Sequence, residues 1–130
     1  MQKNFLVLIS FLTSVIGLIL IYIAALNIQP VEIKISQINS DLIGRSVSTR
    51  GIITQKKLHS DGHMFLMISD DESDIQVPVF SSLMNDLEKE NITESDFKIN
   101  ETISVGGLID EYRGQLQILP RKTSDIKIGG

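Results

Sequence analysis

The residues of this chain best suited to chemistry are flat rings and positive charges that recur together after residue 49. Flat rings stack on unpaired nucleobases, and cations beside them contact phosphates. These residue types therefore favour contact with single-stranded nucleic acid. The candidate binding residues are Arg50, Lys56, Lys57, His63, Phe65, Phe80, Tyr112 and Arg113.

Each candidate also has a purely structural alternative. Phenylalanines such as Phe65 and Phe80 often lie in the core of a small domain. The pair Lys56-Lys57 is typical of a solvated turn, and His63 suits capping or packing beside a hairpin. The sequence leaves these alternatives open.

No constellation of residues predicts catalysis. The chain has no cysteine, which excludes disulfides, thiolate metal sites and cysteine nucleophiles. Its two histidines, His59 and His63, flank one short turn, and no nucleophile motif surrounds them. We therefore predict a protein that is not an enzyme and takes no cofactor.

An acidic cluster follows residue 69. Its four carboxylates are Asp70, Asp71, Glu72 and Asp74. Clustered carboxylates can hold a hard cation, but this spacing lacks the Asp-x-Asp-x-Asp-Gly pattern of a calcium loop. We predict a solvated turn and no metal site.

The hydrophobic pattern predicts mainly β-structure around these candidates. Apolar and polar residues alternate in short runs that end at Gly, Asn or Asp. The turn Ser60-Asp61-Gly62 predicts a hairpin. The expected strands are 47–55, 64–69, 75–80, 102–112 and 115–119, with a helix over 81–90.

Three strands, a helix and two strands follow in the order of the OB-fold, a five-stranded Greek-key barrel. Gly51 predicts a bulge or bend that lets the first strand serve both sides of the barrel. Gly106-Gly107 is expected to interrupt the fourth strand. Pro78 has no N–H and should leave the third strand partly unpaired.

Alternation then selects the outward-facing side chains. If Leu66 and Ile68 face the core, Phe65 and Met67 face outward together with His63. On the third strand the outward set is Gln76, Pro78 and Phe80.

Several stretches resemble one known family. They are Gly51, GHMFLMISD at 62–70, IQVPVF at 75–80, VGG at 105–107 and YRGQLQI at 112–118. Over residues 43–118 the chain is similar to the nucleic-acid-binding OB domain of the exonuclease VII large subunit and of anticodon-binding domains in aminoacyl-tRNA synthetases. The resemblance implies an OB barrel whose ligand lies across the second and third strands. No stretch resembles the catalytic part of the exonuclease.

Residues 5–26 form an apolar run without a charged side chain. At about 1.5 Å per residue, a helix of this length spans roughly 33 Å, enough to cross the core of a bilayer. A signal peptide is the alternative, but its apolar region is usually about 7–15 residues long. We therefore predict an uncleaved transmembrane helix that ends before Pro30.

Charge suggests the orientation of this helix. Lys3 precedes the span, and no cation follows it until Lys34. The positive-inside rule then places the N-terminus in the cytoplasm and the barrel outside. The expected parts are a tip at 1–4, the transmembrane helix at 5–26, a linker at 27–42 and an OB-fold domain at 43–130.

The overall charge is acidic. The chain holds 16 Asp and Glu against 12 Lys and Arg, whereas nucleic-acid-binding domains are usually basic. Two interpretations remain. The first is a membrane-anchored OB-fold protein that binds single-stranded DNA or RNA without catalysis. The alternative is an extracytoplasmic adaptor that binds a protein or small ligand in an envelope complex.

Overall fold

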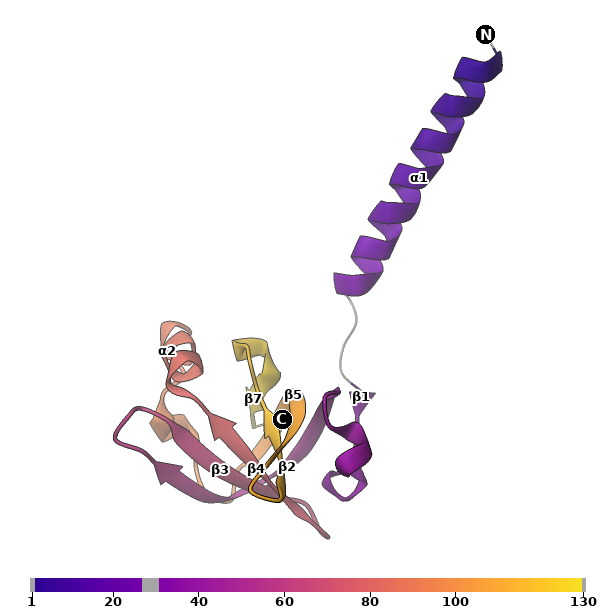
Figure 1. Cartoon of the computed structure of the whole chain (residues 1–130). Coiled ribbons are helices and arrows are strands. Elements are labelled where there is room, and N and C mark those ends of the chain that lie inside the picture. Colours follow the sequence, from indigo (N-terminus) through magenta and orange to yellow (C-terminus); the bar gives the residue numbers. More distant parts are fainter. Residues whose placement is uncertain (1, 27–30, 130) are drawn as a thin grey trace.

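A computed structural model describes residues 2–26 and 31–129, and it shows a long helix followed by a small β-barrel (Figure 1). The α-helices are α1 (Gln2–Leu26) and α2 (Ser81–Lys89). The strands are β1 (Val31–Glu32), β2 (Ser46–Leu58), β3 (Met64–Ser69), β4 (Asp74–Val79), β5 (Thr102–Tyr112), β6 (Gln115–Leu119) and β7 (Ile126–Ile128). The 3-10 turns are η1 (Ile35–Gln37), η2 (Ser40–Leu42), η3 (Glu94–Asp96) and η4 (Thr123–Asp125).

Strands β2, β3, β4, β6 and β5 close into a barrel because β2 also pairs with β5. Neighbouring strands of this five-stranded barrel run antiparallel except β4 and β6, which are parallel and share the single pair Gln76 and Gln117. Pro78 lies beyond that pair, as expected for a residue without an N–H. The short strands β1 and β7 extend the sheet beside β2 and β5. This is the predicted mainly-β OB architecture.

Strand β2 serves both sides of the barrel. It pairs with β5 up to Ile52 and with β3 from Ile52 onward. Gly51 lies at this change of partner, where a Cβ atom would come within 2.9 Å of the Ser69 carbonyl oxygen. The register shift is at Thr54, three residues after the glycine at which the sequence placed a bend or bulge.

Strand β5 runs without interruption through Gly106 and Gly107, so the predicted break in this strand is wrong. The physical reason for Gly107 is close packing rather than a bend. A Cβ atom there would collide with the Leu119 carbonyl oxygen and Pro120 nitrogen. At Gly106 the nearest atom would be 3.6 Å away.

The core fills the barrel from alternating strand positions. Met64, Leu66 and Ile68 of β3 are buried, as are Ile75, Val77 and Val79 of β4. Helix α2 adds Leu83, Met84 and Leu87, all on one side at helical spacing. The alternation predicted for β3 is therefore confirmed, whereas the expected outward exposure of Pro78 on β4 is wrong, because Pro78 is buried like Val77 and Val79 beside it.

Helix α1 contributes nothing to that core. None of its residues is buried, and its leucine, isoleucine and phenylalanine side chains are exposed. Within the described residues it is the one helix long and apolar enough to cross a membrane, a test that a signal sequence also passes.

The boundaries around α1 differ in part from expectation. The helix begins at Gln2 because the polar tip contains no helix-breaking residue. The expected end before Pro30, the first part of the expected linker at 27–30, Met1 and Gly130 lie outside the described residues. The described part of that linker, residues 31–42, buries Ile35 and Ile38 against the barrel.

Candidate nucleic-acid interface

The outer face of β2, β3 and β4 carries two rows of side chains, and we call it the β3 face. Lys57 lies opposite Phe65, and Phe65 lies opposite Pro78. The next row is Gln55, Met67 and Gln76. Directly paired residues of antiparallel strands point to the same side of the sheet, so each row forms a strip across the barrel.

A groove of about 660 Å³ lies over this face. Its lining includes Lys57, His59, Phe65, Met67, Gln76 and Pro78. The floor is largely apolar, with amides at one side and a lysine at the other. Such a surface suits flat ligands that also carry hydrogen-bonding groups and negative charge.

Four rings gather at the hairpin end of the groove. The ring centroids of His59 and Phe65 are 5.5 Å apart, and those of His63 and Phe80 are 5.4 Å apart, both in edge-on contact. Phe80 remains 42% exposed. Phe80 is therefore exposed and Phe65 is half-buried on the side of β3 expected from alternation, and neither belongs to the buried core.

His63 has a structural task as well as a place beside the rings. Its Nδ1 accepts a hydrogen bond of 2.9 Å from the Ser81 backbone N–H at the start of α2. Phe80, the N-cap residue, offers no side-chain acceptor, so His63 caps the helix from the turn that precedes β3. The capping alternative for His63 is thus observed.

Lys56 also lines the groove, but it does not belong to the row of Lys57, Phe65 and Pro78. The extra residue at Thr54 shifts the alternation, so that Lys56 pairs with the inward-facing Leu66. Its Nζ lies 2.6 Å from the Glu94 Oε1 and donates to the Glu94 carbonyl oxygen at 3.3 Å. Of the two lysines, Lys57 is therefore the one that forms no ion pair with any residue that the structure describes.

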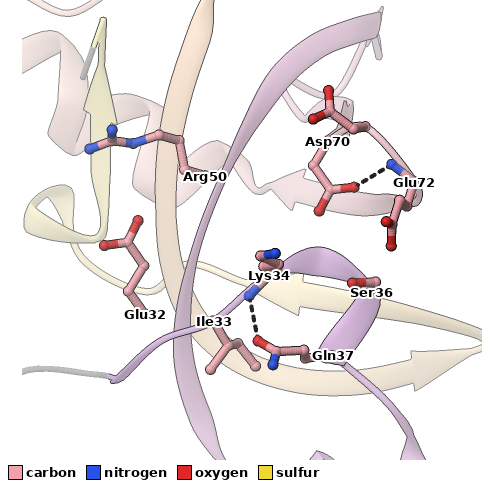
Figure 2. Close-up of a pocket in the computed structure, with 9 residues that line it drawn as sticks. Glu32, Ile33, Lys34, Ser36, Gln37, Arg50, Asp70 and Glu72 are labelled. Carbon is pink, nitrogen blue, oxygen red and sulfur yellow. Dashed lines mark hydrogen bonds between the residues drawn. The ribbon is translucent and has the colours of Figure 1, made fainter.

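Arg50 is also separated from the other candidates. Its Nε donates to the Ser104 Oγ at 3.3 Å across β2 and β5. It lines a different hollow, with Glu32, Lys34 and Asp70 (Figure 2). The two hollows share no lining residue.

Tyr112 and Arg113 lie at the hairpin between β5 and β6. The Arg113 guanidinium stacks over the Tyr112 ring at 5.2 Å, and Tyr112 is 56% exposed. Gln115, which pairs with Tyr112, accepts a 2.6 Å hydrogen bond from the Gln76 side chain. This contact connects the hairpin to the β4 side of the β3 face.

His59 is a groove residue that sequence reasoning left out of the candidate set. Its backbone N–H donates to the His63 carbonyl oxygen at 2.9 Å, which continues the β2–β3 pairing up to the turn. The signal was the symmetric placement of His59 and His63 about Ser60-Asp61-Gly62.

The acidic turn is internally hydrogen bonded. Asp70 Oδ1 accepts from the Glu72 and Ser73 backbone N–H groups at 2.9 Å, and its Oδ2 accepts from Ile35 at 3.1 Å. The hydrogen bonds from Glu72 and Ser73 are the main cause that lowers the pKa of Asp70 below its usual value. Among residues 2–26 and 31–129, no three side chains are grouped to hold a metal ion.

Neither a protein-family model nor a curated protein sequence matches this chain. Solved structures do match its fold. They include Entamoeba histolytica asparaginyl-tRNA synthetase, at 14% identity and a TM-score of 0.61 over 80% of this chain and 24% of that one. An OBody bound to hen egg-white lysozyme matches at 19% identity and a TM-score of 0.56, over 72% and 87% of the respective chains.

The Schizosaccharomyces pombe Stn1–Ten1 complex matches at 12% identity and a TM-score of 0.50, over 64% of this chain and 57% of that one. At these identities the likeness concerns the fold alone. Together with the closed barrel of β2, β3, β4, β6 and β5, it shows that residues 31–129 form an OB-fold.

Proposed function

We propose that this protein is a membrane-anchored OB-fold protein that binds single-stranded nucleic acid on the β3 face, without catalysis. The observation that carries the proposal is the row of Lys57, Phe65 and Pro78 across three strands. It sets a cation beside an accessible ring, which is the pairing that a phosphate and its unstacked base require.

The ligand would lie along the groove from the ring cluster toward the β5–β6 hairpin. Phe65 and Phe80 would stack with bases, and Lys57 would contact a phosphate. Tyr112 and Arg113 would offer a second ring and cation at the far side. The asparaginyl-tRNA synthetases among the structural neighbours support a nucleic-acid ligand.

The anchor and its orientation belong to the same proposal. Helix α1 would cross the bilayer, with Lys3 on the cytoplasmic side and the barrel outside. Protease accessibility of the barrel in intact cells tests this: digestion from outside is expected, whereas full protection would reverse the orientation.

Fluorescence anisotropy with labelled single-stranded DNA and RNA tests the binding. Full-length protein in an uncharged maltoside detergent should bind at low salt and lose affinity as salt rises. Lys57→Gln should reduce the slope of log K against log salt by about 0.7, the value for one lost phosphate contact. Lys127→Gln, which removes an exposed cation from β7, is the matched control and should leave the slope unchanged.

A protein partner is the second candidate function. The acidic balance and the capture of Lys56 by Glu94 leave few cations on the β3 face. Two structural neighbours are themselves bound to proteins, the OBody with lysozyme and Stn1 with Ten1. No oligonucleotide binding at low salt, together with a specific protein captured through the β3 face, would favour this adaptor function.

A further inference from the structure

A second hollow, of about 480 Å³, lies between β1, η1 and the acidic turn. Figure 2 shows Arg50 and Glu32 on one side of it, the turn with Asp70 and Glu72 on the other side, and Lys34 between them. The hollow therefore presents charges of both signs within one concave surface.

The charged side chains that line the hollow do not form ion pairs with one another. In the described part of the chain the ion pairs are Lys56 with Glu94 and Lys89 with Asp86. Arg50 uses only its Nε, toward Ser104. Asp70 is occupied by backbone N–H groups, so the free anionic groups are those of Glu32, Asp71 and Glu72.

A ligand of single charge would meet groups of its own sign here. An anion near Arg50 would lie close to Glu32, and a cation near Glu32 would lie close to Arg50. A zwitterion satisfies both sets at once, with its negative group toward the cations and its positive group toward the carboxylates.

The short segment between α1 and β1 indicates which zwitterion the hollow would meet. Five residue steps separate Leu26 at the end of α1 from Val31 at the start of β1, a reach of at most about 18 Å. Helix α1, with 25 residues, is about 37 Å long and exceeds the roughly 30 Å bilayer core. A spanning α1 therefore holds β1 and the adjacent hollow beside the lipid headgroups.

We propose that this hollow binds the headgroup of a zwitterionic phospholipid, with the phosphate at Arg50 and the ammonium at Glu32, while Lys34 and the acidic turn line the rest of the hollow. The proposal rests on the membrane placement of α1 and is independent of the nucleic-acid ligand. Headgroup binding would fix the β1 side of the barrel to the bilayer and leave the β3 groove free, because the two hollows share no lining residue.

The test uses full-length ¹⁵N-labelled protein in maltoside micelles and two soluble headgroups. Glycerophosphoethanolamine carries the phosphate diester and the amine, whereas glycerophosphoglycerol carries the same diester without the amine. We expect saturable chemical-shift changes at the amides of residues 33–37 and 71–73 with the first, and at least tenfold weaker binding with the second. Equal responses to both, or no response, would overturn the proposal.

Variants sharpen this result. Arg50→Gln and Glu32→Gln should each weaken glycerophosphoethanolamine binding at least fivefold, because each removes one side of the charge complement. Lys57→Gln, on the β3 face, should leave it unchanged. A full effect of Lys57→Gln with none of Arg50→Gln would place the headgroup elsewhere and contradict the proposal.

Nanodiscs identify the bilayer as the source. In phosphatidylethanolamine discs the same amides should already have the shifts of the bound state, while in phosphatidylglycerol discs they should have those of the free state. Identical shifts in the two discs would refute lipid docking. A protein that fails to enter discs would refute the anchor instead, and oligonucleotide binding in the same samples reports separately on the β3 face.

Discussion

The two hollows of the barrel surface differ in what their side chains leave free. On the β3 face the rings and amides are accessible, while one of its two neighbouring lysines is held by Glu94. In the hollow beside β1, Glu32, Lys34 and Arg50 form no ion pair with any residue of 2–26 or 31–129. The first surface suits stacking, and the second suits charge recognition.

The difference follows from how each surface is built. The β3 face comes from strand alternation within the barrel, which places every second side chain outward. The hollow beside β1 comes from the segment after α1 and the turn between β3 and β4, which the barrel brings together. Changes that act on the barrel should therefore affect both surfaces, and changes on one surface should spare the other.

The largest effect is expected from Gly107→Ala, which should disrupt both surfaces together. The added Cβ would overlap the backbone at Leu119 and Pro120, where no side chain can move aside. We expect a loss of about 3 kcal/mol in the free energy of unfolding, measured by chemical denaturation. Gly106→Ala is the matched control, and an equal loss there would contradict the steric explanation.

Phe65→Ala should break the β3 face alone. Loss of one stacking ring is expected to weaken oligonucleotide binding by about 1–3 kcal/mol in the anisotropy assay. Binding of glycerophosphoethanolamine should not change. Leu58→Ala removes an exposed apolar side chain of the same strand pair and serves as the control; if it weakens binding equally, the effect is not stacking.

His63→Ala tests the junction between the ring cluster and α2. Removing the acceptor for the Ser81 N–H should cost about 1 kcal/mol of stability, as for other lost helix caps. Thermal unfolding measures this loss. His59→Ala removes the neighbouring exposed ring without a cap and should cost less; the reverse order would exclude the capping role.

Lys56→Gln should have a small effect that distinguishes it from Lys57. Its partly exposed ion pair with Glu94 is worth at most about 1 kcal/mol, which denaturant unfolding can measure. Oligonucleotide affinity should stay within about twofold of wild type. A salt slope reduced as much as by Lys57→Gln would show that Lys56 leaves Glu94 to meet the ligand.

Asp70→Asn should lower stability slightly at neutral pH and flatten its dependence on pH in the acid range. The pKa of Asp70 is lowered in the folded protein, so its stabilisation is present above the unfolded value of about 3.8 and is lost as pH falls through the folded pKa. Unfolding curves below pH 4 should therefore be less pH-dependent in this variant. Asp71→Asn, whose carboxylate makes none of these hydrogen bonds, should behave like wild type in that range.

Local pattern predicted much of the barrel. The bounds of β3, β5 and β6 match the expected strands, and the burial of Leu66 and Ile68 follows the period of two. Helix α2 begins at Ser81 as its apolar spacing indicated. These features depend on neighbours within a few residues, and for that reason a single sequence reveals them.

The arrangement of cations depended on distant contacts instead. The extra residue at Thr54 decides that Lys57, and not Lys56, faces outward. Glu94 follows Lys56 by 38 residues, and no local sequence pattern predicts their contact. Arg50 precedes the change of partner at Ile52, so it lies on the part of β2 that pairs with β5 and is separated from the ring-side cations.

The single backbone pair between β4 and β6 has a mechanical consequence. Gln76 pairs with Gln117 there, and the Gln76 side chain is hydrogen bonded to Gln115. This seam between β4 and β6 therefore has the fewest paired residues of the strand pairings in the barrel. Local opening of a fold begins where the fewest hydrogen bonds must break. A molecule that binds across the seam only when it is closed stabilises the barrel by RT ln(1 + L/Kd), where L is the free ligand concentration, so the melting temperature continues to rise with ligand concentration after the site is saturated.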